Sequence, residues 1–277
     1  MIMLMLALCV PNLNAQTNSD KDIHKQLEEQ LINTTLAIRH FFSGGDLKYD
    51  ADGTLISGGE PGPWTINAYF EPQKISLSNE SITLSGKRIY WSFPYLKKTP
   101  LLFREAGNTT IEISRSPEQK DLPEIVASLH AVFLKSDESI DALVPPYWTK
   151  VAKADFKRGD NFVSYAAVGA WQKLADTRGI TGPQIIYSPS PPYLEEARKS
   201  RTEGRVMLAI TIDENGNAKV TDIVKPLGLG LDESAIKTVE EAWKFSPAML
   251  DGVPIPYISF ADIRYNIFDI HIILRFP

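Results

Sequence analysis

The sequence predicts an α+β fold in two domains. The N-terminal domain is an antiparallel β-rich domain with flanking helices, and the C-terminal domain is a short helix, a β-hairpin, a helix and a β-strand. Two observations carry this prediction. Residues 46–113 form short runs of alternating apolar and polar residues, spaced about ten residues apart by turns. Residues 206–225 contain a strictly alternating strand, an Asn-Gly turn and a return strand.

Composition limits the class of protein. The chain has 277 residues, which favours two domains over one. Apolar residues make up 43% and charged residues 23%, a composition that excludes extensive disorder. The net charge is −5 without a long run of one sign, so we expect no nucleic-acid surface, which requires clustered Lys and Arg.

The N-terminus is typical of an exported protein. Met1–Val10 is a short apolar run, Pro11 interrupts it, and Ala15 precedes Gln16, which predicts a signal peptide over residues 1–15. We therefore expect a periplasmic or cell-envelope protein. No Lys or Arg precedes the run, so one alternative is a start farther upstream and an uncleaved inner-membrane anchor. The alternative without export is a cytosolic N-terminal strand.

Cysteine usage supports the same compartment. Cys9 is the only cysteine and lies within the apolar run. A lipoprotein site requires a small residue before the cysteine, and Leu8 stands there. Cleavage near Ala15 would leave no cysteine, which excludes disulfides and thiolate metal sites in the mature protein.

The first domain is expected over residues 23–148. Ile23, Leu27, Leu31 and Ile38 predict one helix from residue 23 to 42, ended by residues 43–45 (Ser-Gly-Gly). A second helix is expected over residues 122–134. Four further segments alternate as half-buried strands do. They are residues 75–77, 82–84, 89–93 and 109–113. Residues 149–183 form a partly ordered linker.

The second domain is expected over residues 184–277. Proline keeps residues 188–192 extended, and residues 193–200 form a short helix. The hairpin pairs residues 206–212 with 218–225. Asp232 is expected to cap the second helix, with its carboxylate accepting from free amides. The last strand runs over residues 254–268, and its apolar residues lie on both faces, so it is either central or open to a partner.

The spacing of individual residues in this segment resembles the TonB C-terminal domain over about 85 residues. The residues that carry the resemblance are Tyr193, Ala197, Arg198, Gly204, Val206, Asp213, Gly216, Val220, Gly228, Leu231, Asp232, Ala235, Trp243, Phe245, Pro247, Ala248, Gly252 and Pro254. The chain departs from the family at Leu194, where a Pro commonly follows the Tyr, and it shows no long Pro-rich spacer. The region before it resembles an uncharacterised domain that precedes TonB-like modules in some exported proteins.

The resemblance implies a binding function rather than an enzyme. TonB proteins transmit force to outer-membrane transporters, and their C-terminal domain captures an extended transporter segment beside the last strand of its sheet. Here the matching edge is Ile255–Phe268. The partner-binding residues that it implies are Ile255, Tyr257, Ile258, Phe260, Asp262, Arg264 and Tyr265. The implied partner is a TonB-dependent outer-membrane transporter, with a homodimer or intramolecular pairing as alternatives. The alternative function is a structural or scaffolding envelope protein without energy transduction.

Other chemistry finds little support in the sequence. The four His residues are scattered without zinc spacing, and no nucleophile elbow or phosphate loop is present. Asp213, Asn215 and Asn217 begin like a calcium loop, but Val224 stands where its Glu is required, so a plain hairpin turn is expected. Trp64, Trp91 and Trp148 are expected to pack in the core of the first domain. We expect no cofactor and no metal.

Overall fold

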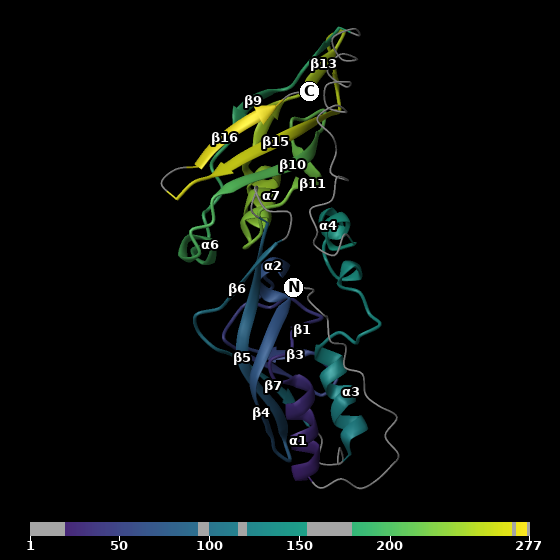
Figure 1. Cartoon of the computed structure of the whole chain (residues 1–277). Helices are drawn as coiled ribbons and strands as arrows, with labels where there is room; N and C mark the ends of the chain where they lie inside the picture. The colour runs from purple at the N-terminus through teal and green to yellow at the C-terminus, as the bar shows by residue number, and fades with distance from the viewer. Residues whose placement is uncertain (1–19, 94–99, 116–120, 154–178, 268–269, 276–277) are drawn as a thin grey trace. The chain divides into compact units, whose positions relative to one another are not determined.

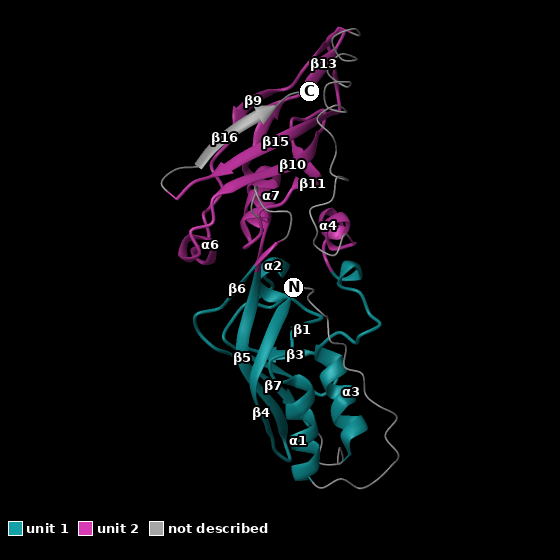
Figure 2. Ribbon diagram, viewed as in Figure 1, with its two compact units in different colours: residues 1–90, 102–143 teal, residues 91–101, 144–277 magenta. Residues whose placement is uncertain are grey.

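The structure is a computed structural model that describes residues 20–93, 100–115, 121–153, 179–267 and 270–275 (Figure 1). It divides into two compact units (Figure 2). The first comprises Met1–Tyr90 and Leu102–Leu143, and the second Trp91–Leu101 and Val144–Pro277. The predicted signal peptide, residues 154–178 of the predicted linker and Phe268 lie outside the described residues. The predicted α+β class is confirmed.

The first unit combines one mixed sheet with helices. Its described helices are α1 (Asp20–Leu31), α2 (Trp64–Asn67), α3 (Leu122–Val132) and the 3-10 turn η1 (Ile140–Ala142). Its strands are β1 (Leu36–Ala37), β2 (Asp46–Tyr49), β3 (Leu55–Ser57), β4 (Tyr69–Leu77), β5 (Ser81–Ser92), β6 (Leu101–Arg104) and β7 (Thr109–Ser114), and the last two residues of β5 and the first of β6 are assigned to the second unit. The strand order is β1-β4-β5-β7-β2-β3, and β6 pairs with β5.

The sheet of the first unit is not wholly antiparallel. β2 and β7 run parallel, with Asp46 opposite Thr110 and Tyr49 opposite Ile113. The expectation of an antiparallel sheet was wrong for this pair. Alternation along β2 reports that Leu47 and Tyr49 face the core, and it carries no information about the direction of the neighbouring strand.

One hydrophobic core holds the first unit together. It joins the apolar stripes of α1 and α3 to the inner face of the sheet. Its central members are Ile23, Leu27, Leu31, Ile82, Leu84, Ile111, Leu122, Ile125 and Leu129, each at most 3% exposed. Burying one such side chain contributes about 2 kcal/mol, so this core is what fixes the helices on the sheet.

The first helix is shorter than the sequence predicts. It ends at Leu31 instead of residue 42. Asn33 takes a left-handed φ of 59°, and the backbone amide and hydroxyl of Thr34 both donate to the Leu31 carbonyl, at 3.2 and 2.7 Å. Ile38 is buried as expected, but it belongs to a β-bridge with Phe133 and not to the helix. The apolar stripe correctly predicted which residues are buried, but it overestimated the length of the helix.

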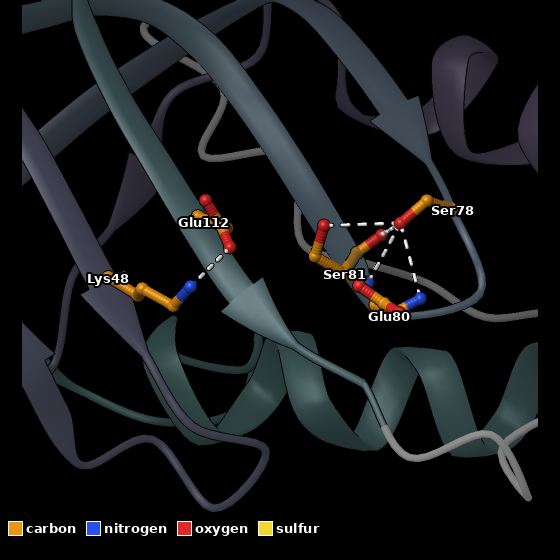
Figure 3. A network of polar contacts seen from close by, with 5 residues as sticks. All are labelled: Lys48, Ser78, Glu80, Ser81 and Glu112. Atoms are coloured by element: carbon orange, nitrogen blue, oxygen red, sulfur yellow. Dashed lines mark hydrogen bonds and ion pairs between the residues drawn. The ribbon is translucent and has the colours of Figure 1, made fainter.

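Polar side chains on β2 and β7 and at the β4–β5 turn hold the register of the first sheet (Figure 3). Lys48 on β2 lies opposite Glu112 on β7, and their ion pair spans 2.9 Å. At the turn between β4 and β5, the Ser78 hydroxyl accepts from the amides of Glu80 and Ser81, at 3.2 and 3.0 Å. These local contacts fix the β4–β5 hairpin and the parallel β2–β7 pair.

The second unit contains the predicted hairpin and the helices around it. Its described helices are the 3-10 turn η2 (Pro146–Trp148), α4 (Thr149–Lys153), α6 (Glu195–Lys199) and α7 (Leu231–Ala242). Its strands are β8 (Ile180–Thr181), β9 (Gln184–Tyr187), β10 (Gly204–Ile212), β11 (Ala218–Lys225), β12 (Lys244–Ser246), β13 (Ala248–Leu250), β14 (Val253–Ile255), β15 (Tyr257–Tyr265) and β16 (Ile270–Arg275).

The main sheet of the second unit has the order β11-β10-β15-β16. The β10–β11 hairpin agrees with the sequence prediction to within two residues, because alternation and the Asn-Gly turn specify it locally. Smaller sheets pair β12 with β9 and β13 with both β14 and β8. None of the helices in the described ranges has the length and apolar character that crossing a bilayer requires.

Candidate functional site

The predicted partner-binding strand is an interior strand of the sheet. β15 pairs with β10 over its whole length, from Tyr257 opposite Ile212 to Tyr265 opposite Gly204, without a register shift. On its other side, Phe260–Tyr265 pair with β16. The prediction that Ile255–Phe268 forms the edge was therefore wrong for Phe260–Tyr265. The apolar faces on both sides of this strand reflect a central position, one of the two readings that the pattern allows.

Six of the seven predicted binding residues lie on β15, and Ile255 does not. Ile255 ends β14 and lies opposite Ala248. Pro256 separates the two strands, because proline has no amide hydrogen to donate to a ladder. Ile258, near the start of β15, is 48% exposed, and the pairing with β16 begins two residues later at Phe260.

The core face of β15 packs toward α7. Ala261, Ile263 and Tyr265 are fully buried. The Tyr265 hydroxyl donates to the carbonyl of Leu231 at 3.0 Å, and its ring meets that of Tyr193 edge-on at 5.7 Å between centroids. Burial raises the pKa of Tyr265 well above its usual value. Tyr265 therefore ties β15 to the start of α7 and offers no free surface.

The opposite face of β15 is also largely occupied. Phe260 packs with Met207, Ala209 and Val224 in a small hydrophobic cluster. Asp262 is 1% exposed and forms an ion pair with Arg205 on β10, whose Nε donates to Oδ1 at 2.8 Å. The side chains of Phe260 and Asp262 therefore make contacts within the sheet.

The helix after the hairpin starts differently from the prediction. Gly230, with a φ of 72°, is the N-cap of α7, and Asp232 lies inside the first turn. The Asp232 carboxylate accepts from the amides of Leu227 and Gly228, so it fixes the loop before the helix instead of the helix's own free amides. Burial raises the pKa of Asp232 and of its neighbour Glu233. The N-cap prediction was wrong because the left-handed Gly230 lets the loop fold back onto the carboxylate.

The structure gives the other candidate groups structural roles. Asp213 Oδ1 accepts from the amides of Asn215 and Asn217, which closes the predicted hairpin turn and lowers the Asp213 pKa. In the described ranges, no group of three or more His, Cys, Asp or Glu side chains is placed to hold a metal ion.

The three tryptophans named from the sequence are all buried, but in different units. Trp64 packs in the first unit, whereas Trp91 and Trp148 belong to the second. Placing all three in the first domain was therefore incorrect. Their partners in the second unit are far away in sequence, and no local pattern indicates them.

The sequence reasoning missed β16. Residues 270–275 (IHIILR) are apolar enough to be a strand, and no turn signal separates them clearly from β15. No element is predicted from the sequence after the strand over residues 254–268. An apolar run directly after a long strand was the available signal for a further hairpin partner.

Comparison with known proteins places the C-terminal segment in a family. Residues 189–267 match the model of the Gram-negative bacterial TonB protein C-terminal family. A curated relative, Protein TonB of Vibrio cholerae serotype O1, is 35% identical over 105 residues, which cover 35% of this chain and 43% of that protein. The chain thus spans less than half of the length of this relative. These two matches show that residues 189–267 are a TonB C-terminal domain, and α6, β10, β11, α7 and β15 lie within it.

Proposed function

We propose that this chain is a cell-envelope protein that binds an extended segment of an outer-membrane transporter through its TonB C-terminal domain. The family match over residues 189–267 and the TonB relative support this proposal. The domain acts by binding, and no catalytic step is assigned to it. Its place is the periplasm, where a transporter's inward-facing segment is within reach.

The observation that carries the proposal is the pairing on β15. A long and regular strand is held on one side by β10 over nine residues and on the other by β16 over six. Strand addition depends on backbone hydrogen bonds, which any extended peptide can supply. A partner segment that takes the place of β16 would recover the bonds to Phe260–Tyr265 without changing the rest of the sheet.

The proposed contact surface comprises Ile258 and Phe260–Tyr265 of β15, and the buried residues among them contribute through their backbone. Phe260–Tyr265 would supply the backbone ladder. Ile258 lies just before that ladder with its side chain half exposed, so it would give the first apolar contact to a segment longer than β16. Arg264 is exposed and would contact the partner's side chains.

The test compares the full chain with a chain ended after Ile267. The probe is a labelled peptide from the extended N-terminal segment of a TonB-dependent transporter of the same organism, titrated by fluorescence anisotropy. Without β16 the peptide meets no competitor, so we expect binding at least about tenfold tighter, equivalent to about 1.4 kcal/mol. Ile263→Pro removes one amide from the ladder and should abolish binding in the shortened chain.

A matched control uses the other margin of the same sheet. Lys219→Ala changes an exposed side chain on β11 and should leave the peptide affinity unaltered. Equal affinity of the full and shortened chains would show that β16 does not compete with the peptide, and the β15 site would have to be abandoned.

The same pairing favours a second candidate function. Because β16 already occupies β15, the domain can serve as a closed structural or scaffolding element of the envelope without coupling to a transporter. In that case no transporter peptide binds either chain, and the shortened chain associates with itself through the exposed strand.

A further inference from the structure

Two segments that precede the TonB C-terminal domain in sequence are part of the second unit. They are Trp91–Leu101, at the end of β5, and the chain from Val144 onward, which includes η2 and α4 (Figure 2). The family match begins only at residue 189, so neither segment belongs to it. Their contacts show what they add to the domain.

The first segment pairs with the loop that leads into α7. The amide of Leu229 donates to the Trp91 carbonyl and the amide of Phe93 to the Leu227 carbonyl, both at 2.8 Å. Ser92 forms an antiparallel bridge with Gly228. Gly228 has a φ of 85°, and a Cβ built on it would lie 2.2 Å from the Trp91 carbonyl oxygen. This close backbone approach requires glycine.

The second segment lies on β11 and on the first turn of α7. Trp148 is fully buried, and its Nε1 donates to Glu233 Oε1 at 2.9 Å. Lys150 forms an ion pair with Asp222 on β11, and η2 packs against that strand. The rings of Phe93 and Trp148 lie 6.0 Å apart, so the two segments also contact each other. Residues 91–93 and 146–150 are called the covering segments below.

β11 is the first strand of the order β11-β10-β15-β16, so one of its sides carries no strand of this sheet. Proteins commonly protect such a strand by a loop or helix, a charge or a bulge. All three are present here. The 3-10 turn η2 packs on it, Lys150 pairs with its Asp222, and the β10–β11 register shifts twice. The β10–β15 pair, by contrast, has no register shift.

We infer that the covering segments close the β11 side of the sheet, so that no second strand, from a partner or from another copy of this chain, can be added beside β11. The inference does not require the proposed transporter partner. It also makes the functional folding unit larger than residues 189–267, because the loop before α7 obtains two of its backbone hydrogen bonds from Trp91 and Phe93.

The test uses the full chain carrying Trp148→Phe together with Lys150→Glu. The first change keeps an aromatic ring and removes the Nε1 donor. The second places a negative charge at position 150, opposite the negative charge of Asp222. Hydrogen exchange is measured at the amides of residues 219–225 on β11 and 257–265 on β15, and the mass of the particle by sedimentation.

We expect exchange on β11 to accelerate at least about tenfold, exchange on β15 to stay within about twofold, and the mass to rise with concentration above that of the wild type. Lys153→Glu makes the same charge change at an exposed position of the same helix and should change none of these readouts. Gly228→Ala, which pushes Trp91 away, is a second and independent variant.

Two results would overturn the inference. Unchanged β11 exchange in both the double variant and Gly228→Ala would show that the segments do not protect this strand. Uniform acceleration across β11 and β15 would show that they stabilise the whole unit without covering an edge. Neither readout uses the transporter peptide, so both are independent of the test of the proposed function.

Discussion

The two sides of the second unit's sheet are protected by different means. β11 is covered by long side chains from distant segments, with a buried tryptophan, an ion pair and two register shifts. β15 is covered by β16, a short strand near the end of the chain. Removing a side-chain cover costs buried area, whereas a strand held by backbone hydrogen bonds can be exchanged for another strand at small net cost. The β11 side is therefore called the closed side, and the β16 side, on the proposed function, the exchangeable side.

The largest effect should come from removing the buried side chain on the closed side. Trp148→Ala leaves a cavity and a Glu233 carboxylate without its indole donor, so we expect a loss of about 4 kcal/mol in the unfolding free energy of the second unit. Urea denaturation, monitored by the circular dichroism of the backbone instead of by tryptophan fluorescence, measures this loss. A loss below about 1 kcal/mol would show that the cover on β11 contributes little.

The next largest effect should come from the ion pair between Arg205 on β10 and Asp262 on β15. Asp262→Ala leaves Arg205 without its carboxylate, and Arg205 is partly exposed, so the expected loss is about 2 kcal/mol. The double variant Arg205→Met with Asp262→Leu should recover most of that stability. If the single variant instead weakened only peptide binding, Asp262 would belong to the partner surface and not to the sheet.

A smaller effect is expected in the pH dependence of stability. Burial raises the folded-state pKa of Glu233, so the folded chain retains a proton that the unfolded chain releases above about pH 4.3. Stability is then largest at acidic pH and declines as pH rises through the folded pKa. Glu233→Gln should make the unfolding free energy less dependent on pH between 5 and 8. If the unfolding free energy changed with pH equally in both proteins, the pH dependence would not come from Glu233.

The smallest effect should come from the exposed ion pair between Lys150 and Asp222 on the closed side. Lys150 is 60% exposed on its side chain, so Lys150→Ala is expected to cost about 0.5 kcal/mol. Thermal unfolding at low and high salt separates the ion pair from packing, because only the former is screened. A loss comparable to that of Trp148→Ala would make the ion pair, and not the indole, the main element of the closed side.

Local sequence signals predicted the elements that local interactions specify. The hairpin of β10 and β11 follows from alternation and Asn215-Gly216, and the helix expected over residues 122–134 is α3, where the Asp121 carboxylate accepts from the Glu124 amide at the start. The candidate strand, predicted over residues 254–268, was correct only for β15, where Ala261, Ile263 and Tyr265 recur every second residue; residues 254–255 belong to β14.

The sequence could not indicate which strands pair with each other or where the first helix ends. The end of α1 depends on Asn33 adopting a left-handed conformation, and the direction of β2 depends on β7, more than 50 residues later. The status of β15 as interior strand depends on residues 270–275 pairing with it. Alternation reports which side chains are buried, and it does not report which strand buries them.

The contact between Ser92 and Leu227 joins residues 135 positions apart and has a consequence for the order of folding. Trp91–Phe93 are synthesised long before the loop that receives them, so their backbone groups must wait for most of the remaining chain. Closing so long a loop is entropically costly and slow. We expect the β10–β11 hairpin to form early and the docking of Trp91–Phe93 to be among the late events, which leaves an unpaired strand end exposed to chaperones in the interval.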